Sequence, residues 1–100
     1  MKIDITSNAS GKLKNILEEK DASSAKVRIF LAGIGWGGPR FSLALDEQKE
    51  NDKIYSEDGI HIIADKNLIE QFKGFKIDYS NFFLTKGFSI YPYSSSASTC

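Results

Sequence analysis

The spacing of hydrophobic residues changes near residue 25, from a helical repeat to a strand repeat. Before that point the apolar side chains lie three to four positions apart, which is typical of one face of an amphipathic helix. They are Ile5, Ala9, Leu13, Ile16 and Leu17. The pattern predicts a helix over residues 6–20, capped at its start by the hydroxyl group of Thr6 or Ser7.

From residue 25 the apolar positions alternate with other residues, which predicts strands with one buried face. The first run points Val27, Ile29 and Leu31 to one side and Arg28 and Phe30 to the other. A second alternating run follows a glycine-rich stretch, with apolar residues at Phe41, Leu43 and Leu45. These two runs predict two strands joined by the glycine-rich segment.

The next segments predict a hairpin and a short helix. Residues 54–63 surround the pair Asp58-Gly59, a two-residue turn that suits the twist of antiparallel strands. Residues 65–72 predict a helix that begins after Asp65 as the capping residue.

The last apolar segments resemble each other. GFKIDYS (74–80) and GFSIYPYS (87–94) each predict a short strand that follows a glycine. Neighbouring strands with similar burial explain the likeness, and so does an internal duplication. Pro92 places the second strand at a sheet edge or at a strand end, because proline cannot donate to the ladder.

The patterns together predict a mainly β (α+β) fold, with antiparallel strands, an N-terminal helix and one short internal helix. We assign residues 1–93 to this single domain. Residues 94–100 have no apolar pattern, and we expect them to form a flexible tail.

Composition narrows the functional class. The 100 residues include thirteen basic and thirteen acidic side chains, and this net charge of zero argues against binding to nucleic acid or to an anionic membrane. No apolar run approaches the roughly 20 residues of a membrane helix, and residues 1–10 lack the apolar stretch of a signal peptide. The only cysteine, Cys100, excludes an internal disulfide. We expect a cytoplasmic protein.

The stretch GIGWGGPRF, residues 33–41, is the most unusual part of the sequence. Gly33, Gly35 and Gly38 match the spacing of a dinucleotide-binding loop, but that loop requires a helix directly after it and a strand pattern follows here. Trp36 stands among these glycines and Gly37. It could pack as a lid over the sheet, or stand exposed as an interaction anchor.

Other polar groups give weaker signals. His61 is the only histidine and falls in a strand pattern, which favours a partly exposed residue over a metal ligand. Six carboxylates crowd the turns, where they could bind a hard cation but more typically face solvent. These are Asp46, Glu47, Glu50, Asp52, Glu57 and Asp58. No nucleophile, base and orienting group stand together in the sequence, so we expect no enzyme.

The order and spacing of several segments resemble the HesB-like proteins, the A-type carriers of iron–sulfur cluster biogenesis. The resemblance runs nearly end to end, through ITSNASGKLKNIL, VRIFLAG, the glycine loop, LALDE, DGIHIIAD, FKGFKIDY and GFSIYP. It implies a small, mainly β domain that dimerises or tetramerises, and an iron–sulfur cluster as the bound group. It also implies iron–sulfur assembly proteins and apo-protein acceptors as partners.

The family's functional residues are three cysteines, one in a glycine loop and two in a C-x-C pair after a proline. By the resemblance, these positions fall at Trp36, Ser98 and Cys100, with Gly33, Gly35, Gly37 and Gly38 supporting the loop. Only Cys100 is a cysteine. Because cluster iron is held by thiolates, and an indole offers only an N–H donor, we expect this chain to bind no cluster.

The form of the loop is similar to a HesB-like branch that carries cysteine or selenocysteine at position 36. The codons for selenocysteine (UGA), cysteine (UGU and UGC) and tryptophan (UGG) differ by one base. Trp36 can therefore stand in for either residue, or mark natural divergence. This leaves three hypotheses open: an iron–sulfur biogenesis protein, a non-catalytic binding module that uses Trp36, and a thiol or selenol redox protein.

Overall fold

The structure is a computed structural model that describes residues 2–20, 25–36, 38–57, 59–80 and 87–94. Seven strands and two helices make up this part of the chain. In order they are β1 (Lys2–Ile5), α1 (Ser7–Glu19), β2 (Lys26–Gly35), β3 (Gly38–Asp46), β4 (Asp52–Glu57), β5 (Ile60–Asp65), α2 (Lys66–Phe72), β6 (Gly74–Ser80) and β7 (Gly87–Pro92). The mainly β prediction with two helices is confirmed.

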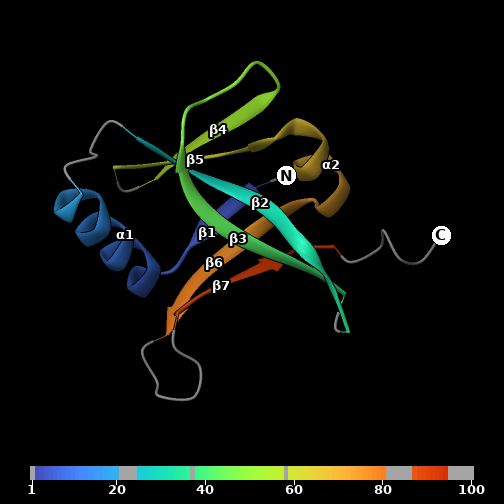
Figure 1. The fold of residues 1–100 in the computed structure, drawn as a ribbon, viewed down its shortest axis with the longest axis horizontal. Coiled ribbons are helices and arrows are strands. Elements are labelled where there is room, and N and C mark those ends of the chain that lie inside the picture. Colours follow the sequence, from blue (N-terminus) through green and yellow to red (C-terminus); the bar gives the residue numbers. More distant parts are fainter. Residues whose placement is uncertain (1, 21–24, 37, 58, 81–86, 95–100) are drawn as a thin grey trace.

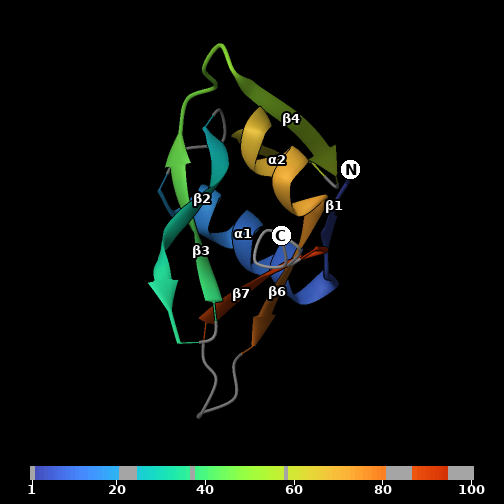
Figure 2. The same cartoon turned by 90° about the vertical axis from the view of Figure 1, so that its right-hand side faces the viewer.

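The strands form two sheets, one with the order β1-β6-β7 and one with the order β3-β2-β5-β4. Figure 2 shows the β2–β3 hairpin on one side of the molecule and β1, β6 and β7 on the other. The prediction of antiparallel strands holds for three of the five described pairings. The other two, β1 with β6 and β2 with β5, are parallel, so the sheets are mixed.

The first strand is the element that the hydrophobic pattern did not predict. Ile5 lies in β1, opposite Ile77 of β6, and not on the face of the first helix. The helix begins one residue later than expected, and Thr6 caps it by accepting a hydrogen bond from the N–H of Ala9 at 3.2 Å. The Thr6 hydroxyl also donates to Asp78 at 2.7 Å, which ties the start of α1 to β6.

The core lies between the sheets and is closed by the apolar faces of both helices. Its fully buried side chains come from every layer, and its largest member is Phe75 of β6. Phe41 of β3 meets Phe72 and Phe75 edge to face, with ring centroids 5.0 and 4.8 Å apart. These contacts attach the β2–β3 hairpin to α2 and β6.

The two ends of the described chain meet at one end of the three-stranded sheet. Gly74 is the register partner of Lys2, and its carbonyl accepts a hydrogen bond from the N–H of Tyr93 at 3.1 Å. The Tyr93 hydroxyl donates to the Asp4 carboxylate. β7 ends at Pro92 on a sheet edge, as predicted.

The tail prediction for residues 94–100 is only partly within the described chain. Ser94 donates its N–H to the carbonyl of Phe72 at 2.9 Å, so ordered structure reaches at least this residue. Residues 95–100 lie outside the described part.

Candidate functional site

The glycine-rich segment forms the tip of the hairpin made by β2 and β3. The two strands stay paired out to Gly35 and Gly38, with Trp36 in the turn between them. A strand, and no helix, follows the glycines, which confirms that the segment is not a dinucleotide-binding loop. Figure 1 shows the hairpin extending to the lower right of the molecule, away from α1.

Trp36 stands in solvent at this tip. Its side chain is fully exposed, and nearby Ile34 is 81% exposed. The indole therefore does not cover the sheet as a lid, and the exposed alternative is the one observed. A large apolar side chain that is fully hydrated gains no burial energy within its own chain, so its position favours contact with something else.

The glycines of the loop differ in whether the local structure requires a residue without a side chain. Gly38 has φ 103°, a conformation that side-chain-bearing residues avoid. A Cβ atom at Gly35 would lie 3.2 Å from the Nε atom of Arg40, so this glycine leaves room for the arginine side chain. Gly33 has neither a positive φ nor a neighbour within 4 Å of an added Cβ.

The described residues include only some of the positions that the family resemblance assigns to the site. Trp36 is described, whereas Gly37, Ser98 and Cys100 lie outside the described residues. Within the described ranges, no group of three or more His, Cys, Asp or Glu side chains could hold a metal ion. The described residues do not fit an iron–sulfur cluster, because the tip carries an indole where a thiolate would be needed.

His61 is an exposed strand residue, as predicted. It lies opposite Ser56 in the β4–β5 pair, and its Nδ1 is 2.6 Å from the Ser56 hydroxyl oxygen. A nucleophilic site would need a serine and a histidine at such a distance, together with a third group that orients the histidine ring. Among the described residues no hydrogen bond orients Nε2 of His61, and both side chains are exposed to solvent.

A charge cluster around Arg28 is the polar feature that sequence reasoning missed. Arg28 of β2 donates from Nε to Asp46 at 2.6 Å and from Nη1 to Asp52 at 2.7 Å. It joins β2 to the end of β3 and the start of β4. Both of these turn carboxylates pair with a cation; the side chain of Asp46 stays 33% exposed, whereas that of Asp52 is 3% exposed. Strand register, which the sequence did not provide, was needed to find this cluster.

The pKa values of the cluster follow from these contacts. Hydrogen bonds from the backbone N–H of Glu47, then from Arg28 and Lys49, lower the pKa of Asp46 to about 2. The hydrogen bond from Arg28 is the main cause that lowers the pKa of Asp52. The same bond raises the pKa of Arg28 above its usual range. All three groups stay charged at neutral pH, so the cluster holds strands together and does not exchange protons.

The chain is 32% identical over 75 residues to the iron–sulfur cluster insertion protein ErpA of Marinobacter nauticus, which covers 74% of this chain and 68% of that protein. The chain belongs to the ErpA family. The ErpA protein of Francisella philomiragia is 29% identical over 80 residues, covering 79% and 69%. No family model matches the chain.

Solved structures support the fold of this ErpA-family chain. IscA crystallised with a 2Fe–2S cluster superposes with a TM-score of 0.75 at 22% identity, covering 90% of this chain and 84% of that one. Escherichia coli SufA gives a TM-score of 0.76 at 17% identity, covering 93% and 82%. The expected resemblance to HesB-like, A-type proteins is confirmed at the level of the family. The selenocysteine-related branch stays a prediction.

Neither helix in the described ranges is long and apolar enough to span a membrane.

Proposed function

We propose that this ErpA-family chain takes part in iron–sulfur cluster delivery without holding a cluster on its own hairpin. Family membership supports the first part, because the relatives are named as cluster insertion proteins. The exposed indole of Trp36 carries the second part. It stands where the resemblance places a cysteine, and its ring nitrogen is a hydrogen-bond donor that cannot replace a thiolate.

In this proposal the chain acts through protein contacts, in the cytoplasm and not as an enzyme. Its partners are iron–sulfur assembly proteins or apo-protein acceptors. Trp36 and Ile34 supply the contact, because a tryptophan at the tip of a projecting hairpin can enter a pocket on a partner with little rearrangement.

Anaerobic reconstitution with iron and sulfide tests the proposal on the full chain. The unmodified protein should retain no stoichiometric iron and no visible charge-transfer absorption. Trp36→Cys should gain part of that absorption with a matching iron and sulfide count, because it restores a thiolate at the tip. Adding Ser98→Cys should strengthen binding, since it recreates the C-x-C pair with Cys100.

Trp36→Ser is the matched control, because it removes the same indole without adding a soft ligand. It should bind no more iron than the unmodified chain. Stoichiometric cluster binding by the unmodified chain would show that the ligand assignment is wrong. A double cysteine variant that folds normally and binds no iron would refute the family positions assigned to Trp36 and Ser98.

Two other functions remain as candidates. The exposed tip formed by Ile34 and Trp36 favours a binding module whose partners lie outside cluster delivery. A partner found by pull-down with the unmodified chain, but not with Trp36→Ser, would be an unrelated protein in that case. The redox alternative requires cysteine or selenocysteine at position 36, and the gene codon at that position decides it.

A further inference from the structure

Among the described strands, only β5 lies beside one edge of β2, and it pairs there with two residues, Val27 and Arg28. β5 ends at Asp65, whose side chain caps α2 by accepting from the N–H of Asn67 at 2.8 Å. In the described part of the chain, residues 29–35 therefore pair with β3 on one side, apart from Ala32, and have no strand on the other.

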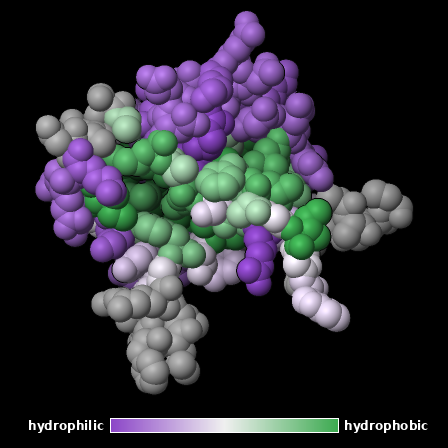
Figure 3. All heavy atoms as spheres, in the orientation of Figure 1, coloured by the Kyte–Doolittle hydropathy of each residue, from purple (hydrophilic) through white to green (hydrophobic). Residues whose placement is uncertain are grey.

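This edge of residues 29–35 lacks the charged side chains and prolines that keep sheet edges from pairing with other chains. The outer strands of both sheets carry such residues: Asp4 in β1, Pro39, Arg40 and Asp46 in β3, Asp52, Lys53 and Glu57 in β4, and Pro92 in β7. The segment IFLAGIG has none of them, and its Phe30, Leu31 and Ile34 are exposed. Figure 3 shows apolar residues across the middle of the face that β2 and β3 cross, below a hydrophilic upper part. An added strand would gain both backbone hydrogen bonds and apolar burial at this edge.

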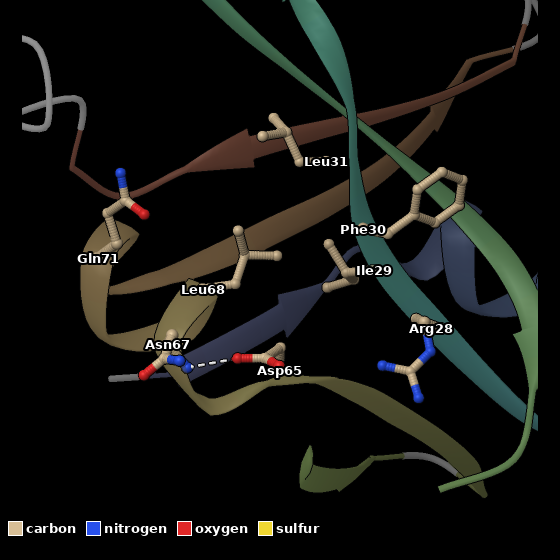
Figure 4. A pocket seen from close by; sticks show the side chains of 8 residues that line it. All are labelled: Arg28, Ile29, Phe30, Leu31, Asp65, Asn67, Leu68 and Gln71. Atoms are coloured by element: carbon tan, nitrogen blue, oxygen red, sulfur yellow. Dashed lines mark hydrogen bonds between the residues drawn. The ribbon is translucent and has the colours of Figure 1, made fainter. Parts of the chain in front are cut away.

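A hollow with a volume of about 280 Å³ lies between this edge and α2. Leu31 of β2 and Leu68 of α2 approach it from the two elements (Figure 4). Asp65 lies at the end where Arg28 lies, and Gln71 lies at the other end. The hollow therefore has an apolar middle and polar ends, and side chains on one face of an added strand would enter it.

Asp65 gives one end of the hollow a negative charge. Its Oδ1 atom accepts from the N–H of Asn67, and within the described ranges no ion pair joins its carboxylate to a cation. Arg28, the other charged side chain that lines the hollow, is already paired with Asp46 and Asp52. This end of the hollow therefore favours a cationic group on whatever binds there.

We propose that the edge of residues 29–35 binds an extended segment of a partner protein, in which a lysine or arginine is followed or preceded by apolar residues at every second position. The segment pairs with β2 as an added strand. Because side chains two positions apart lie on the same face of a strand, the basic group reaches Asp65 while the apolar groups lie between Leu31 and Leu68. The inference does not rest on the function proposed above, since it requires neither a cluster nor an iron–sulfur protein.

A synthetic peptide, acetyl-KTVTVTK-amide, is a suitable probe of this site. Its lysines and valines lie on one face of an extended strand, and a lysine at each end serves either strand direction. The peptide is titrated into the isotope-labelled full chain and followed by NMR. The amide signals of residues 29–35 should shift in a saturable way. Alternate amides in this segment should also exchange more slowly with solvent, because a strand donates to one neighbour from every second residue.

Two matched pairs of variants separate the charge from the apolar contact. Asp65→Asn keeps the helix cap, because asparagine caps as well as aspartate, and should weaken binding about three- to fivefold. Glu70→Gln removes the same charge from an exposed position of α2 outside the hollow, and should bind like the unmodified chain. Leu31→Lys places a cation in the hollow and should abolish binding. Leu45→Lys makes the same change at an exposed position of β3 and should retain it.

A control peptide, acetyl-ETVTVTE-amide, should bind more weakly than the lysine peptide, and the NMR spectrum of each variant shows whether it is folded. Equal binding of the two peptides would overturn the proposal, as would unchanged binding by Asp65→Asn or shifts confined to Trp36 at the hairpin tip. Absence of saturable shifts at millimolar peptide would overturn it as well. Slow exchange of residues 29–35 without peptide, increasing with protein concentration, would show that a second copy covers this edge and would also refute the proposal.

Discussion

The Arg28 cluster makes a strong prediction about stability. Asp52 has a side chain that is only 3% exposed, and its two carboxylate oxygens accept from both terminal nitrogens of Arg28. Asp52→Asn keeps the size of the side chain and removes its charge. The variant should fold, because Arg28 keeps its bond to Asp46 and Asn can still accept from the N–H of Lys49.

The expected loss is about 2 kcal/mol in the free energy of unfolding at neutral pH. A hydrogen bond to a charged group contributes about 1.5–3 kcal/mol. The remaining Asp46 limits the loss below the roughly 3–5 kcal/mol that follows when a buried charge is left with no partner. With a urea m value of about 1–3 kcal/mol/M, the midpoint of unfolding should fall by about 1 M.

The lowered pKa of Asp52 determines the direction in which the loss of stability changes with pH. The pKa of Asp52 is lowered in the folded protein, whereas a carboxyl group in the unfolded chain titrates near about 3.9. The contribution of the charged pair is therefore complete above the unfolded value and is lost as the pH falls through the folded value. Protonated Asp52 resembles Asn, so the difference between the two proteins should shrink toward zero in acid.

Urea unfolding followed by circular dichroism, repeated from neutral pH downward, measures this difference directly. Lys53→Gln is a suitable control, because it removes a charge from an exposed neighbouring position. A destabilisation by Asp52→Asn that stays constant as the pH falls would refute the ion-pair explanation and indicate altered packing.

Three further predictions concern the core and the hairpin, each measured by thermal or urea unfolding. Phe75→Ala should lower the free energy of unfolding by about 3–5 kcal/mol, because the ring is fully buried. Phe30→Ala should lower it by only about 1 kcal/mol, because this ring is partly exposed, and equal losses would contradict the assigned core. Gly38→Ala should cost about 1–2 kcal/mol because of its φ of 103°, and Gly33→Ala should be neutral within about 0.5 kcal/mol. Trp36→Ser should also change stability by less than about 0.5 kcal/mol, and a larger loss would mean that the indole packs on its own chain.

Much of the secondary structure could be predicted from hydrophobic spacing. Both helices begin and end within about one residue of the predicted positions, because Thr6 and Asp65 cap them with side-chain hydrogen bonds that the sequence makes visible. The antiparallel pair of β4 and β5 was predicted for the same kind of reason, from the local signal of Asp58-Gly59, of which Asp58 lies outside the described residues. Local chemistry of this kind can be recognised without the rest of the fold.

Features that depend on distant residues could not be predicted. β1 is short, and its pairing with β6 across more than seventy positions of sequence left no local pattern. The alternation in β2 predicted a buried Leu31, but the side chain is 43% exposed, because among the described residues β5 pairs with β2 only at Val27 and Arg28, and the ladder with β3 shifts between Leu31 and Gly33. The partnership of Arg28 with Asp46 and Asp52 likewise depends on register between three strands.

The meeting of the two ends of the described chain at Gly74 has a mechanical consequence. β1 and β7 flank β6 on opposite sides, and both Lys2 and Tyr93, near the two ends of the described chain, lie at the Gly74 end of that strand. A force that pulls the two ends apart therefore acts across the strands and opens the hydrogen bonds of the sheet in succession. Strands loaded along their length would share the force among all their bonds at once. Pulled at residues 2 and 93, the domain should thus unzip at low force, and the β2–β3 hairpin, which is not in the line of pull, should be loaded last.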